Sequence, residues 1–593
     1  MKKVKICFCE PFLLSGILPT LASPTLLSAV KQKGYEGKIF YPSITFFLEK
    51  KLWKDELLMT LADDIPLQIV DYLFDDDAED SIRSRLLQEL PLAVRSTDVI
   101  EHIIELRIAA QTYVKKTAKE IADSDPNFVC VSLTFGGYHF VNMLFDAIRQ
   151  HSCDAFFLLG GSSCTPDIAK KQLKAIPKAN YILCDETPSS LLEIIGNLSL
   201  HREPLPTCAA SIKHAPLELR TLVDMDNLPV PDFSDFFALT DCYGIKRSDI
   251  TLPYEISRGC WWCEQKPCSM CGFFGTRNKY ICKSPKKVIS DLQTLSELWH
   301  VYKYRFSDLV QPKAPFLQKL LPLEYNYFHL FWEIRPDITL QELKLLRRIG
   351  MTFAQVGIES LCTEALKHMN KGTTGIHNIE LLVWAQTLKI DLFWNYLYGL
   401  PDDQVEWYTK IADLIPHLLH LAPPIPRKMW YNKYSTWASD LSDGLSVFLG
   451  HSDNGKRLEK SYTILCDAIE TWRISHKRNF SLQIDGNYSD GIHIIRNYEQ
   501  EEHFYYYGKS AELYQHCFQA DTVSEAAVAL SITEEQCSSI LSNFVKNGLM
   551  VFLDGYYLSV AEGNSLYRWT RPEEQVLDNS FFKRREASIK NGV

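Results

Sequence analysis

The chain has 593 residues, of which 46% are hydrophobic and 23% charged, so its composition is globular and its length predicts about four domains. The formal net charge of −10 argues against a general binder of nucleic acids or anionic membranes, and no run of about 20 apolar residues predicts a spanning helix. Seventeen cysteines without a secretory signal predict a reducing, cytoplasmic location, in which cysteines serve as thiols and metal ligands.

The first 200 residues alternate between predicted strands and helices. We expect strands at residues 4–10, 38–41, 128–134, 155–159 and 181–184, with helices between them and a long, mostly helical insertion near residues 46–122. This alternation predicts a doubly wound parallel sheet in an α/β fold, and such sheets bind ligands at the carboxyl ends of their strands. The candidate ligand-binding residues at those ends are Glu10, Thr134, Gly136, Gly160 and Gly161.

Four cysteines lie within twelve residues, shortly after a proline-containing segment at residues 201–250 that we interpret as a linker. They are Cys260, Cys263, Cys268 and Cys271. Cysteines crowded in this way are usually metal ligands, because several thiolates must converge on one soft metal centre. The two C-x2-C pairs of a zinc site normally lie a dozen or more residues apart, whereas only four residues separate these pairs. The spacing therefore favours an iron–sulfur cluster, with a zinc site as the alternative.

Residues 251–440 repeat a strand and helix pattern that predicts a partial (β/α)6 barrel. Strands are expected at residues 304–307, 328–333, 352–356 and 391–396, and helices at 284–298, 341–348, 377–388 and 404–418, with a further helix capped by Thr363. Ligand groups of such barrels lie at the strand ends.

Residues 441–593 predict a helical segment to about residue 478, followed by an α+β module. Strands at 480–484, 492–498 and 504–507 precede helices at 511–518, 522–530 and 533–547, and Asp554-Gly555 predicts the turn of a closing hairpin. This order is typical of a winged helix. DNA binding is one role of that fold, but the segment lacks the strong basic patch that nucleic-acid affinity requires.

The segment Arg258-Gly-Cys260-Trp-Trp, with Cys268 and Cys271, resembles the C-x7-C-x2-C motif of cobalamin-dependent radical S-adenosylmethionine (SAM) enzymes of ribosomal peptide maturation. The C-methyltransferases of the bottromycin and polytheonamide pathways are of this type. The resemblance implies that Cys260, Cys268 and Cys271 hold a [4Fe–4S] cluster whose fourth iron is open to SAM. Cys263 occupies a position where the family usually has glycine, so Cys263 is the rival of Cys260 for the third ligand position.

The resemblance also assigns cofactor roles at the strand ends. Gly357-Ile-Glu359-Ser360, followed by Met369-Asn-Lys371, is similar to the segment that holds SAM: a carboxylate accepts both ribose hydroxyls, and a lysine pairs with the methionyl carboxylate. Glu333, Arg335 and Asn395 are expected to help, although Asn395 is also a plausible turn residue. The first 200 residues are similar to the cobalamin-binding domain of the family. They lack the D-x-H-x-x-G motif, so that motif does not supply a lower cobalt ligand.

These observations together predict an enzyme that methylates an unactivated carbon in a ribosomally made precursor peptide. Such a carbon has no acidity for a base to use, so a radical made with SAM, the cluster and an external electron donor abstracts the hydrogen, and cobalamin supplies the methyl group. The C-terminal module is weakly similar to PqqD-like modules that bind leader peptides at a strand edge. Two alternatives are a radical enzyme that cross-links or rearranges peptides with an auxiliary or lost corrinoid, and a zinc-knuckle binding protein with a winged helix.

Overall fold

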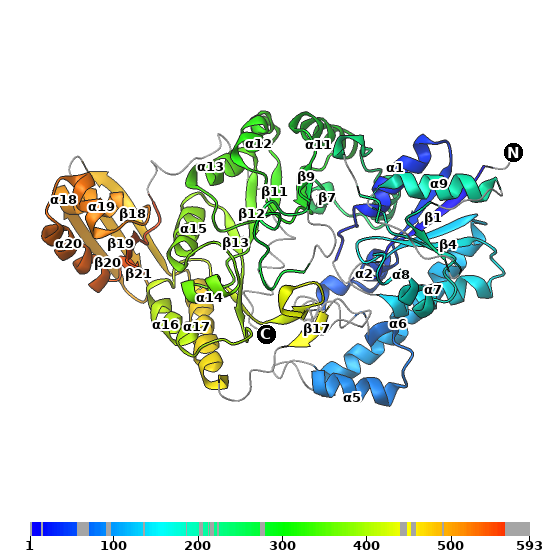
Figure 1. Ribbon diagram of the computed structural model, residues 1–593, viewed down its shortest axis with the longest axis horizontal. Helices are drawn as coiled ribbons and strands as arrows, with labels where there is room; N and C mark the ends of the chain where they lie inside the picture. The colour runs from blue at the N-terminus through cyan, green and yellow to red at the C-terminus, as the bar shows by residue number, and fades with distance from the viewer. Residues whose placement is uncertain are drawn as a thin grey trace.

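Three parts of the chain lie side by side along its longest axis (Figure 1). An α/β unit occupies one end, a parallel barrel the middle, and a small module of strands and helices the other end. The computed structural model describes residues 3–13, 16–55, 70, 72–89, 97–133, 137–185, 187–200, 206–211, 213, 219–221, 224–272, 279–438, 448–451, 458–488 and 491–563. No helix among these residues is long and apolar enough to span a bilayer.

The N-terminal sheet has the strand order β2-β1-β3-β4-β5-β6, and all neighbours are parallel except the last pair. The bounds are β1 Lys5–Cys9, β2 Glu36–Phe40, β3 Phe128–Ser132, β4 Phe156–Gly160, β5 Tyr181–Leu183 and β6 Ala209–Ala210. Successive side chains of β1 enter different cores: Ile6 and Phe8 pack with α1 (Ala22–Gln32) and α9 (Pro188–Ser199), whereas Cys7 and Cys9 pack with helices of the other face. This alternation follows from the two-residue period of a strand, and it makes the sheet doubly wound.

The helices on the second face include the predicted insertion. They are α2 Pro42–Lys50, α5 Glu79–Glu89, α6 Thr97–Asp123, α7 Tyr138–Gln150 and α8 Ala169–Ala175. Helix α6 has 27 residues and buries Ile100, Ile103 and Ile104 and their equivalents in later turns, as an amphipathic helix does. Residues 201–250 are more than the linker that we predicted, because they contribute β6 and α10 (Ser234–Cys242), whose Phe236 contacts the ring of Tyr41.

The barrel consists of a five-stranded parallel sheet, β13-β12-β11-β10-β7, and a separate parallel pair, β14-β15. Its strands are β7 Leu252–Tyr254, β10 Lys303–Phe306, β11 His329–Ile334, β12 Met351–Val356, β13 Asp391–Phe393, β14 Asn395–Tyr398 and β15 Ile425–Lys428. Its helices are α11 Pro285–Trp299, α12 Ala314–Lys319, α13 Leu340–Ile349, α14 Thr363–His368, α15 Gly375–Thr387 and α16 Glu406–Leu414. Helix α14 begins at Thr363 and its cap is Cys362, so the predicted cap was one residue late.

The single strand predicted at residues 391–396 is divided at Trp394. The Trp394 side chain is buried, and its indole donates to the carbonyl of Ala422 at 3.0 Å. Strand β13 pairs with β12, whereas β14 pairs with β15, so the barrel opens at this point. One backbone bridge, between Glu359 and Tyr396, still joins the two parts of the barrel.

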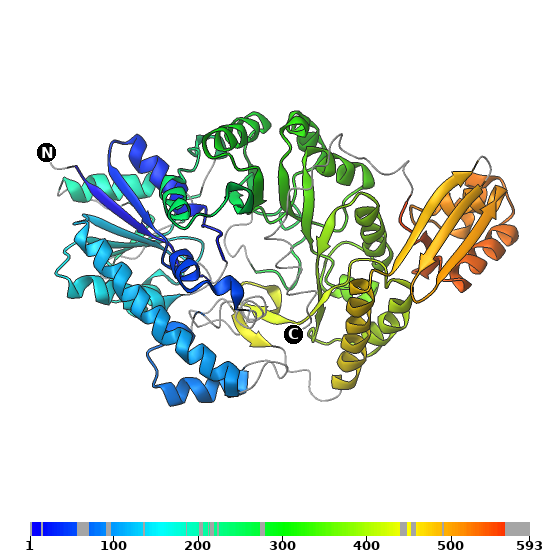
Figure 2. The same ribbon diagram turned by 180° about the vertical axis from the view of Figure 1, so that it is seen from behind.

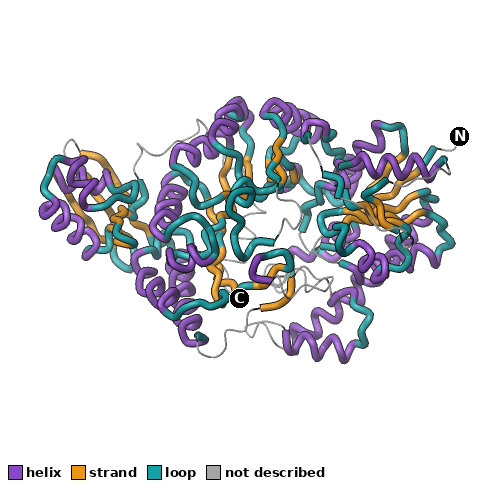
Figure 3. The backbone as a smooth tube through the Cα atoms, in the orientation of Figure 1, coloured by secondary structure: helices purple, strands orange, loops and turns teal. Residues whose placement is uncertain are grey.

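Among the described residues, the C-terminal module has a three-stranded antiparallel sheet, three helices and a hairpin. Figures 2 and 3 show it at the end of the molecule opposite the N-terminal unit. Its elements are β18 Ser481–Tyr488, β19 Gly491–Asn497, β20 Glu501–Tyr507, α18 Gly508–His516, α19 Val523–Leu530, α20 Glu534–Lys546, β21 Met550–Leu553 and β22 Tyr556–Ser559. Asp554 and Gly555 both have positive φ, as the predicted turn requires.

The segment predicted to be helical at residues 440–478 is helical only in part. Helix α17 spans Glu459–Lys477, and β17 (Phe448–His451) pairs antiparallel with β16 (Trp430–Asn432). Two further short strands, β8 (Ser257–Arg258) and β9 (Ile281–Cys282), pair with each other on either side of the four cysteines. We name residues 255–272, which carry these cysteines, the cysteine loop. One hydrophobic core is continuous from a face of the N-terminal sheet through the barrel into the C-terminal module.

Candidate functional site

The cysteine loop begins where β7 ends, and a buried carboxylate holds its first residues. Asp308, which lies just beyond the end of β10, accepts the backbone N–H groups of Ile256 at 2.8 Å and Ser257 at 2.6 Å. Its second oxygen accepts the indole N–H of Trp332 at 2.9 Å. Burial raises the pKa of Asp308 to about 7, although the donated hydrogen bonds oppose this shift. Asp308 therefore joins three strands of the barrel behind the cysteine loop, a role that we did not predict.

The four cysteines of the loop are partly exposed thiols. Cys268 and Cys271 form a tight turn, in which the N–H of Cys271 donates to the carbonyl of Cys268 at 3.1 Å. The pKa of Cys263 is raised by burial and, to a smaller extent, by the neighbouring Cys260 and Cys268. Within the described part of the chain, no three His, Cys, Asp or Glu side chains are already arranged as a metal site. The assignment of Cys260, Cys268 and Cys271 as ligands therefore stays a prediction.

The loop packs against the segment that carries Lys371. The N–H of Ser269 donates to the carbonyl of Met369 at 2.9 Å, and the amide of Asn370 donates to the carbonyl of Pro267 at 2.7 Å. The indole of Trp262 lies against Gly372, where any Cβ atom would collide with the ring. Residues 369–372 were assigned to SAM binding from the sequence, and the structure brings them into direct contact with the cysteine loop.

Arg335 lies between these two segments. Its guanidinium is stacked 4.2 Å from the ring of Trp262 and donates to the carbonyl of Lys371 at 2.7 Å. It also pairs with Asp337 at 2.8 Å. Stacking of Arg on Trp stabilises such a contact by about 0.5–2 kcal/mol. The structure thus places Arg335 at the predicted site, where it joins the loop to the barrel.

Glu359 and Lys371 meet at the end of β12. The Nζ atom of Lys371 is 3.4 Å from Oε1 of Glu359, and both side chains are largely buried. Gly357 leaves the space for this pair, because a Cβ atom there would lie 3.0 Å from the Lys371 nitrogen. Glu359 has φ = +63°, an unusual conformation for a glutamate, and its carbonyl accepts the N–H of Leu397 at 2.8 Å. The backbone is thus held in a conformation that directs Glu359 toward Lys371.

The remaining predicted residues of the barrel differ in their surroundings. Ser360 is buried, donates to the hydroxyl of Tyr396 at 3.1 Å and accepts the N–H of Cys362 at 3.0 Å, so its hydroxyl serves the protein interior. Glu333 lies on β11 opposite Gln355 of β12 and is half-buried. Asn395 begins β14, and its Oδ1 atom is buried without a hydrogen-bond partner among the described residues.

These features fit a bound group that carries hydroxyls and a carboxylate. Glu359 offers two acceptor oxygens, Lys371 offers an ammonium group, and the buried Oδ1 of Asn395 needs a donor that the described residues do not supply. Glu359 lies just beyond the end of β12 and Asn395 begins β14, whereas Lys371 lies in the loop after α14, which adjoins the cysteine loop.

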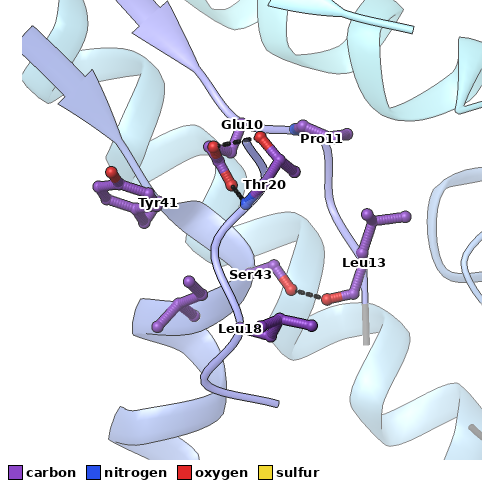
Figure 4. Close-up of a pocket in the computed structure, with 8 residues that line it drawn as sticks. Glu10, Pro11, Leu13, Leu18, Thr20, Tyr41 and Ser43 are labelled. Atoms are coloured by element: carbon purple, nitrogen blue, oxygen red, sulfur yellow. Dashed lines mark hydrogen bonds between the residues drawn. The ribbon is translucent and has the colours of Figure 1, made fainter. Parts of the chain in front are cut away.

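At the N-terminal sheet, Glu10 follows β1 but its carboxylate is engaged within the protein (Figure 4). It accepts the N–H of Thr20 at 2.9 Å and also the Thr20 hydroxyl, and burial raises its pKa to about 7. The small pocket beside it is lined by Glu10, Pro11, Leu13, Leu18, Thr20, Tyr41, Ser43 and Ile44. In this structure Glu10 closes the loop that follows β1, and a contact with cobalamin stays a prediction.

Gly160 and Gly161 allow the chain to pass close to β3. The carbonyl of Gly160 accepts the N–H of Leu133 at 2.7 Å. Gly161 has φ = +107°, and a Cβ atom there would lie 2.6 Å from the carbonyl oxygen of Leu133. Thr134 and Gly136, the other predicted cobalamin residues, lie outside the described residues. Among the described residues of this edge, Glu10 and Gly160 make hydrogen bonds within the protein.

Comparison with known proteins gives a likeness of fold. No protein-family model matches the sequence, and a search of curated proteins finds no match. Among solved structures, the chain is similar to the radical SAM methyltransferase TsrM from Kitasatospora setae, which was solved with a tryptophan substrate and a SAM analogue bound. The identity is 12%, the TM-score is 0.51, and the match covers 78% of this chain and 89% of TsrM.

A second similar structure is the cobalamin-dependent SAM radical enzyme OxsB with aqua-cobalamin and SAM bound, at 13% identity and a TM-score of 0.48. That match covers 80% of this chain but only 56% of OxsB, so this chain corresponds to little more than half of OxsB. The described chain, an α/β protein with parallel sheets, is therefore similar in fold to TsrM.

Proposed function

We propose that this protein is a cobalamin-dependent radical SAM enzyme that methylates an unactivated carbon in a ribosomally made precursor peptide. The observation that carries the proposal is the contact between the cysteine loop and residues 369–372, beside the Glu359–Lys371 pair. A cluster held by Cys260, Cys268 and Cys271 would adjoin the place where the sequence motif predicts SAM. The likeness of fold to TsrM and the motif resemblance support the proposal.

When bound, the [4Fe–4S] cluster, SAM and cobalamin supply the radical and methyl-transfer chemistry, with electrons from an external donor. The protein's own residues bind and orient these groups. In the proposal Glu359 accepts the ribose hydroxyls and Lys371 pairs with the methionyl carboxylate. Arg335 and Trp262 hold the cysteine loop against the barrel, and Asp308 holds its first residues. Such preorganisation matters because small misplacements of reacting groups cost large factors in rate.

The C-terminal module offers an edge for the peptide. Within the described residues β20 pairs only with β19, whereas residues near Glu562 cover part of the edge of β18. The side chains of Tyr505 and Tyr507 on β20 are 53% and 64% exposed, and Tyr505 is stacked 4.3 Å from His493. An extended leader peptide adding to β20 gains main-chain hydrogen bonds, and side-chain pockets give specificity.

Deletion of the module is a poor test of peptide recognition, because the module shares its core with the barrel. Trp384 of α15 donates to the carbonyl of Phe518 at 3.0 Å, and His420 contacts both Tyr498 and the carbonyl of Val560. Point variants of β20 test peptide recognition without removing this shared core. We expect Tyr505→Ser with Tyr507→Ser to weaken precursor binding without loss of iron, whereas Tyr325→Ser, at an 80% exposed site outside the module, should change neither.

The proposal is tested by the spectrum and product of anaerobically purified protein. We expect iron–sulfur and cobalamin absorption, and a 14-dalton increase per methyl group in a co-expressed precursor peptide, roughly the mass of one CH2 unit. Iron–sulfur absorption without cobalamin and without this increase would favour the cross-linking or rearranging enzyme. A colourless zinc protein would favour the binding protein and end the proposal.

A further inference from the structure

Residues 429–438, which we name the bridging segment, leave the barrel and cross to the cysteine loop. The segment begins where the N–H of Met429 donates to the carbonyl of Tyr398 at 2.8 Å. It includes β16, and further on Trp437 stacks 5.2 Å from His368, the last residue of α14. The bridging segment therefore packs against the end of α14.

The bridging segment contacts the Cys268–Cys271 turn directly. The hydroxyl of Thr436 donates to the carbonyl of Ser269 at 3.0 Å, and the N–H of the same Ser269 is bound by Met369 at 2.9 Å. Ser269 is thus held on both sides, by the barrel on one and by the bridging segment on the other. Because Ser269 lies inside the turn, these two bonds limit how far apart Cys268 and Cys271 can move.

Gly272, the residue after Cys271, packs against the same segment. A Cβ atom at Gly272 would collide with Oδ1 of Asn432 and would lie 2.7 Å from the backbone nitrogen of Ser435. Asn432 is 4% exposed, and its Oδ1 accepts the N–H of Tyr434 at 3.1 Å, so it does not yield easily. The hydroxyl of Ser435 is buried here without a hydrogen-bond partner among the described residues.

The bridging segment also reaches the N-terminal unit. The hydroxyls of Tyr434 and Thr165 are 3.4 Å apart, and Thr165 lies in the loop that follows Gly160 and Gly161. The hydroxyl of Thr165 donates to Asp167, so Tyr434 is the donor to Thr165. One short segment therefore contacts both the turn of the predicted cluster ligands and the predicted cobalamin edge of the sheet.

We propose that the bridging segment is a positioning element: Thr436 holds the Cys268–Cys271 turn in the geometry that the cluster needs, and Tyr434 joins that turn to the Thr165 loop. The inference rests on the proposed function only for the identity of the group that the cysteines bind. The contacts themselves involve only residues of this chain, so they can be tested first in metal-free protein.

The first experiment compares amide hydrogen exchange in metal-free wild type, Thr436→Val and Thr471→Val. Thr471 is a matched control, because its hydroxyl also donates to a backbone carbonyl at 3.0 Å, in the remote helix α17. We expect Thr436→Val to speed exchange in residues 268–272 by roughly fivefold, the effect of one lost hydrogen bond, and Thr471→Val to leave it unchanged. Unchanged exchange in Thr436→Val would overturn the inference.

The second experiment measures how fast a chelator removes iron from the reconstituted protein. Thr436→Val should lose iron several-fold faster than wild type, and Thr436→Ser, which keeps the hydroxyl, should restore the slow rate. Equal rates in all three proteins would overturn the positioning role. If the protein takes up no iron at all, the proposed function fails, whereas the exchange experiment still decides whether Thr436 holds the turn.

The third experiment tests the contact with the sheet. Tyr434→Phe removes only the hydroxyl that meets Thr165, so exchange in residues 161–168 should rise, while Tyr431→Phe, a neighbouring tyrosine variant, should leave it unchanged. No rise in Tyr434→Phe would show that the bridging segment does not join the two units.

Discussion

The rule that ligands bind at the carboxyl ends of parallel strands predicted candidate residues both in the barrel and in the N-terminal sheet. The residues at these two edges nevertheless differ in what they contact. In the barrel, Arg335, Glu359 and Lys371 gather beside the cysteine loop. In the N-terminal sheet, Glu10 is bound by Thr20. Gly161 there permits a close approach of two chain segments. Both edges follow from parallel topology, but among the described residues it is at the barrel edge that charged side chains gather in one place.

The difference shows what topology decides and what it leaves open. A parallel sheet brings the carboxyl ends of its strands to one edge, so position can be read from the order of strands and helices. Whether a carboxylate at that edge faces a ligand depends on the donors that the next loop brings. Glu10 and Asp308 both follow strands. Glu10 accepts the N–H and the hydroxyl of Thr20 from its own loop, whereas Asp308 accepts the N–H groups of Ile256 and Ser257 from the cysteine loop.

The largest expected effect concerns the choice between Cys260 and Cys263. Cys260→Ala should reduce SAM cleavage by more than about 100-fold, since loss of even an outer-shell partner of a metal ligand costs about 10–100-fold. Cys263→Ala should keep cleavage within a few-fold of wild type, because a fourth thiolate would close the iron that SAM needs. The measurement is anaerobic formation of 5′-deoxyadenosine together with iron content.

Retention of cleavage in Cys260→Ala and its loss in Cys263→Ala would reverse the assignment and give a C-x4-C-x2-C ligand spacing.

Next in size is the effect of Glu359→Gln on SAM affinity. Loss of a charge-assisted hydrogen bond to ribose should cost about 1.5–3 kcal/mol, which weakens SAM binding roughly 10- to 150-fold. Equilibrium dialysis of the reconstituted protein measures this directly. Glu406→Gln is the control, because Glu406 is an exposed residue in the first turn of α16. An unchanged dissociation constant in Glu359→Gln would place the SAM pocket elsewhere and remove the contrast between the two edges.

Asp308→Asn tests whether an enclosed carboxylate can still matter to the site. The amide oxygen of the substituted side chain can accept the N–H groups of Ile256 and Ser257, but its NH2 group would face the N–H of Trp332, so we expect a loss of about 1–3 kcal/mol in stability. Iron content should fall as the start of the loop loosens, whereas Asp413→Asn, on the exposed side of α16, should have no effect.

The double variant Asp308→Asn with Trp332→Phe also removes the indole N–H that would face the new NH2 group. It therefore distinguishes a clash between these two donors from general destabilisation. Its loss of stability should be smaller than the sum of the two single losses. Additive losses would mean that Asp308 acts by some other contact.

The sequence pattern was sufficient to predict most elements of both parallel sheets. Strands buried on both faces and helices buried on one face differ in the spacing of their apolar residues, so the two can be told apart. The division at Trp394 was missed, since residues 391–396 read as one apolar run and the indole bond to Ala422 is a tertiary contact. Strand β17 was missed for a similar reason: it is a strand because β16 pairs with it.

To predict the site residues, the resemblance to the family motif was needed as well as the hydrophobic periodicity of the sequence. Glu359 and Lys371 are twelve positions apart, and nothing in periodicity predicts that they meet over Gly357. Asp308 carried a usable signal, because an acidic residue two positions beyond a buried strand lies at the same edge as the predicted ligands. Thr436 carried none, since its partner Ser269 is 167 residues away and both are ordinary turn residues.

The smallest effect, and the most direct test of the N-terminal edge, is expected for Glu10→Gln. Burial raises the pKa of Glu10 from 4.5 to about 7, so between these values the folded protein holds a proton that the unfolded chain has lost. The contribution of Glu10 to the free energy of unfolding is therefore greatest at low pH, and it falls as pH rises from 4.5 to about 7. Gln cannot ionise, so Glu10→Gln should remove this slope and raise stability at pH 8 by about 1 kcal/mol, after weaker bonds to Thr20 offset part of the gain.

Thermal unfolding of cofactor-free protein between pH 5 and pH 8 measures this dependence of stability on pH. Titration of the same variant with hydroxocobalamin then tests whether Glu10 also contributes to cobalamin binding. If Glu10 only closes its own loop, the variant binds cobalamin as well as wild type does. A clear loss of cobalamin affinity in a variant that is as stable as wild type would mean that Glu10 turns outward to the ligand when cobalamin binds. The two strand-end edges would then work in the same way, and the contrast between them would not hold.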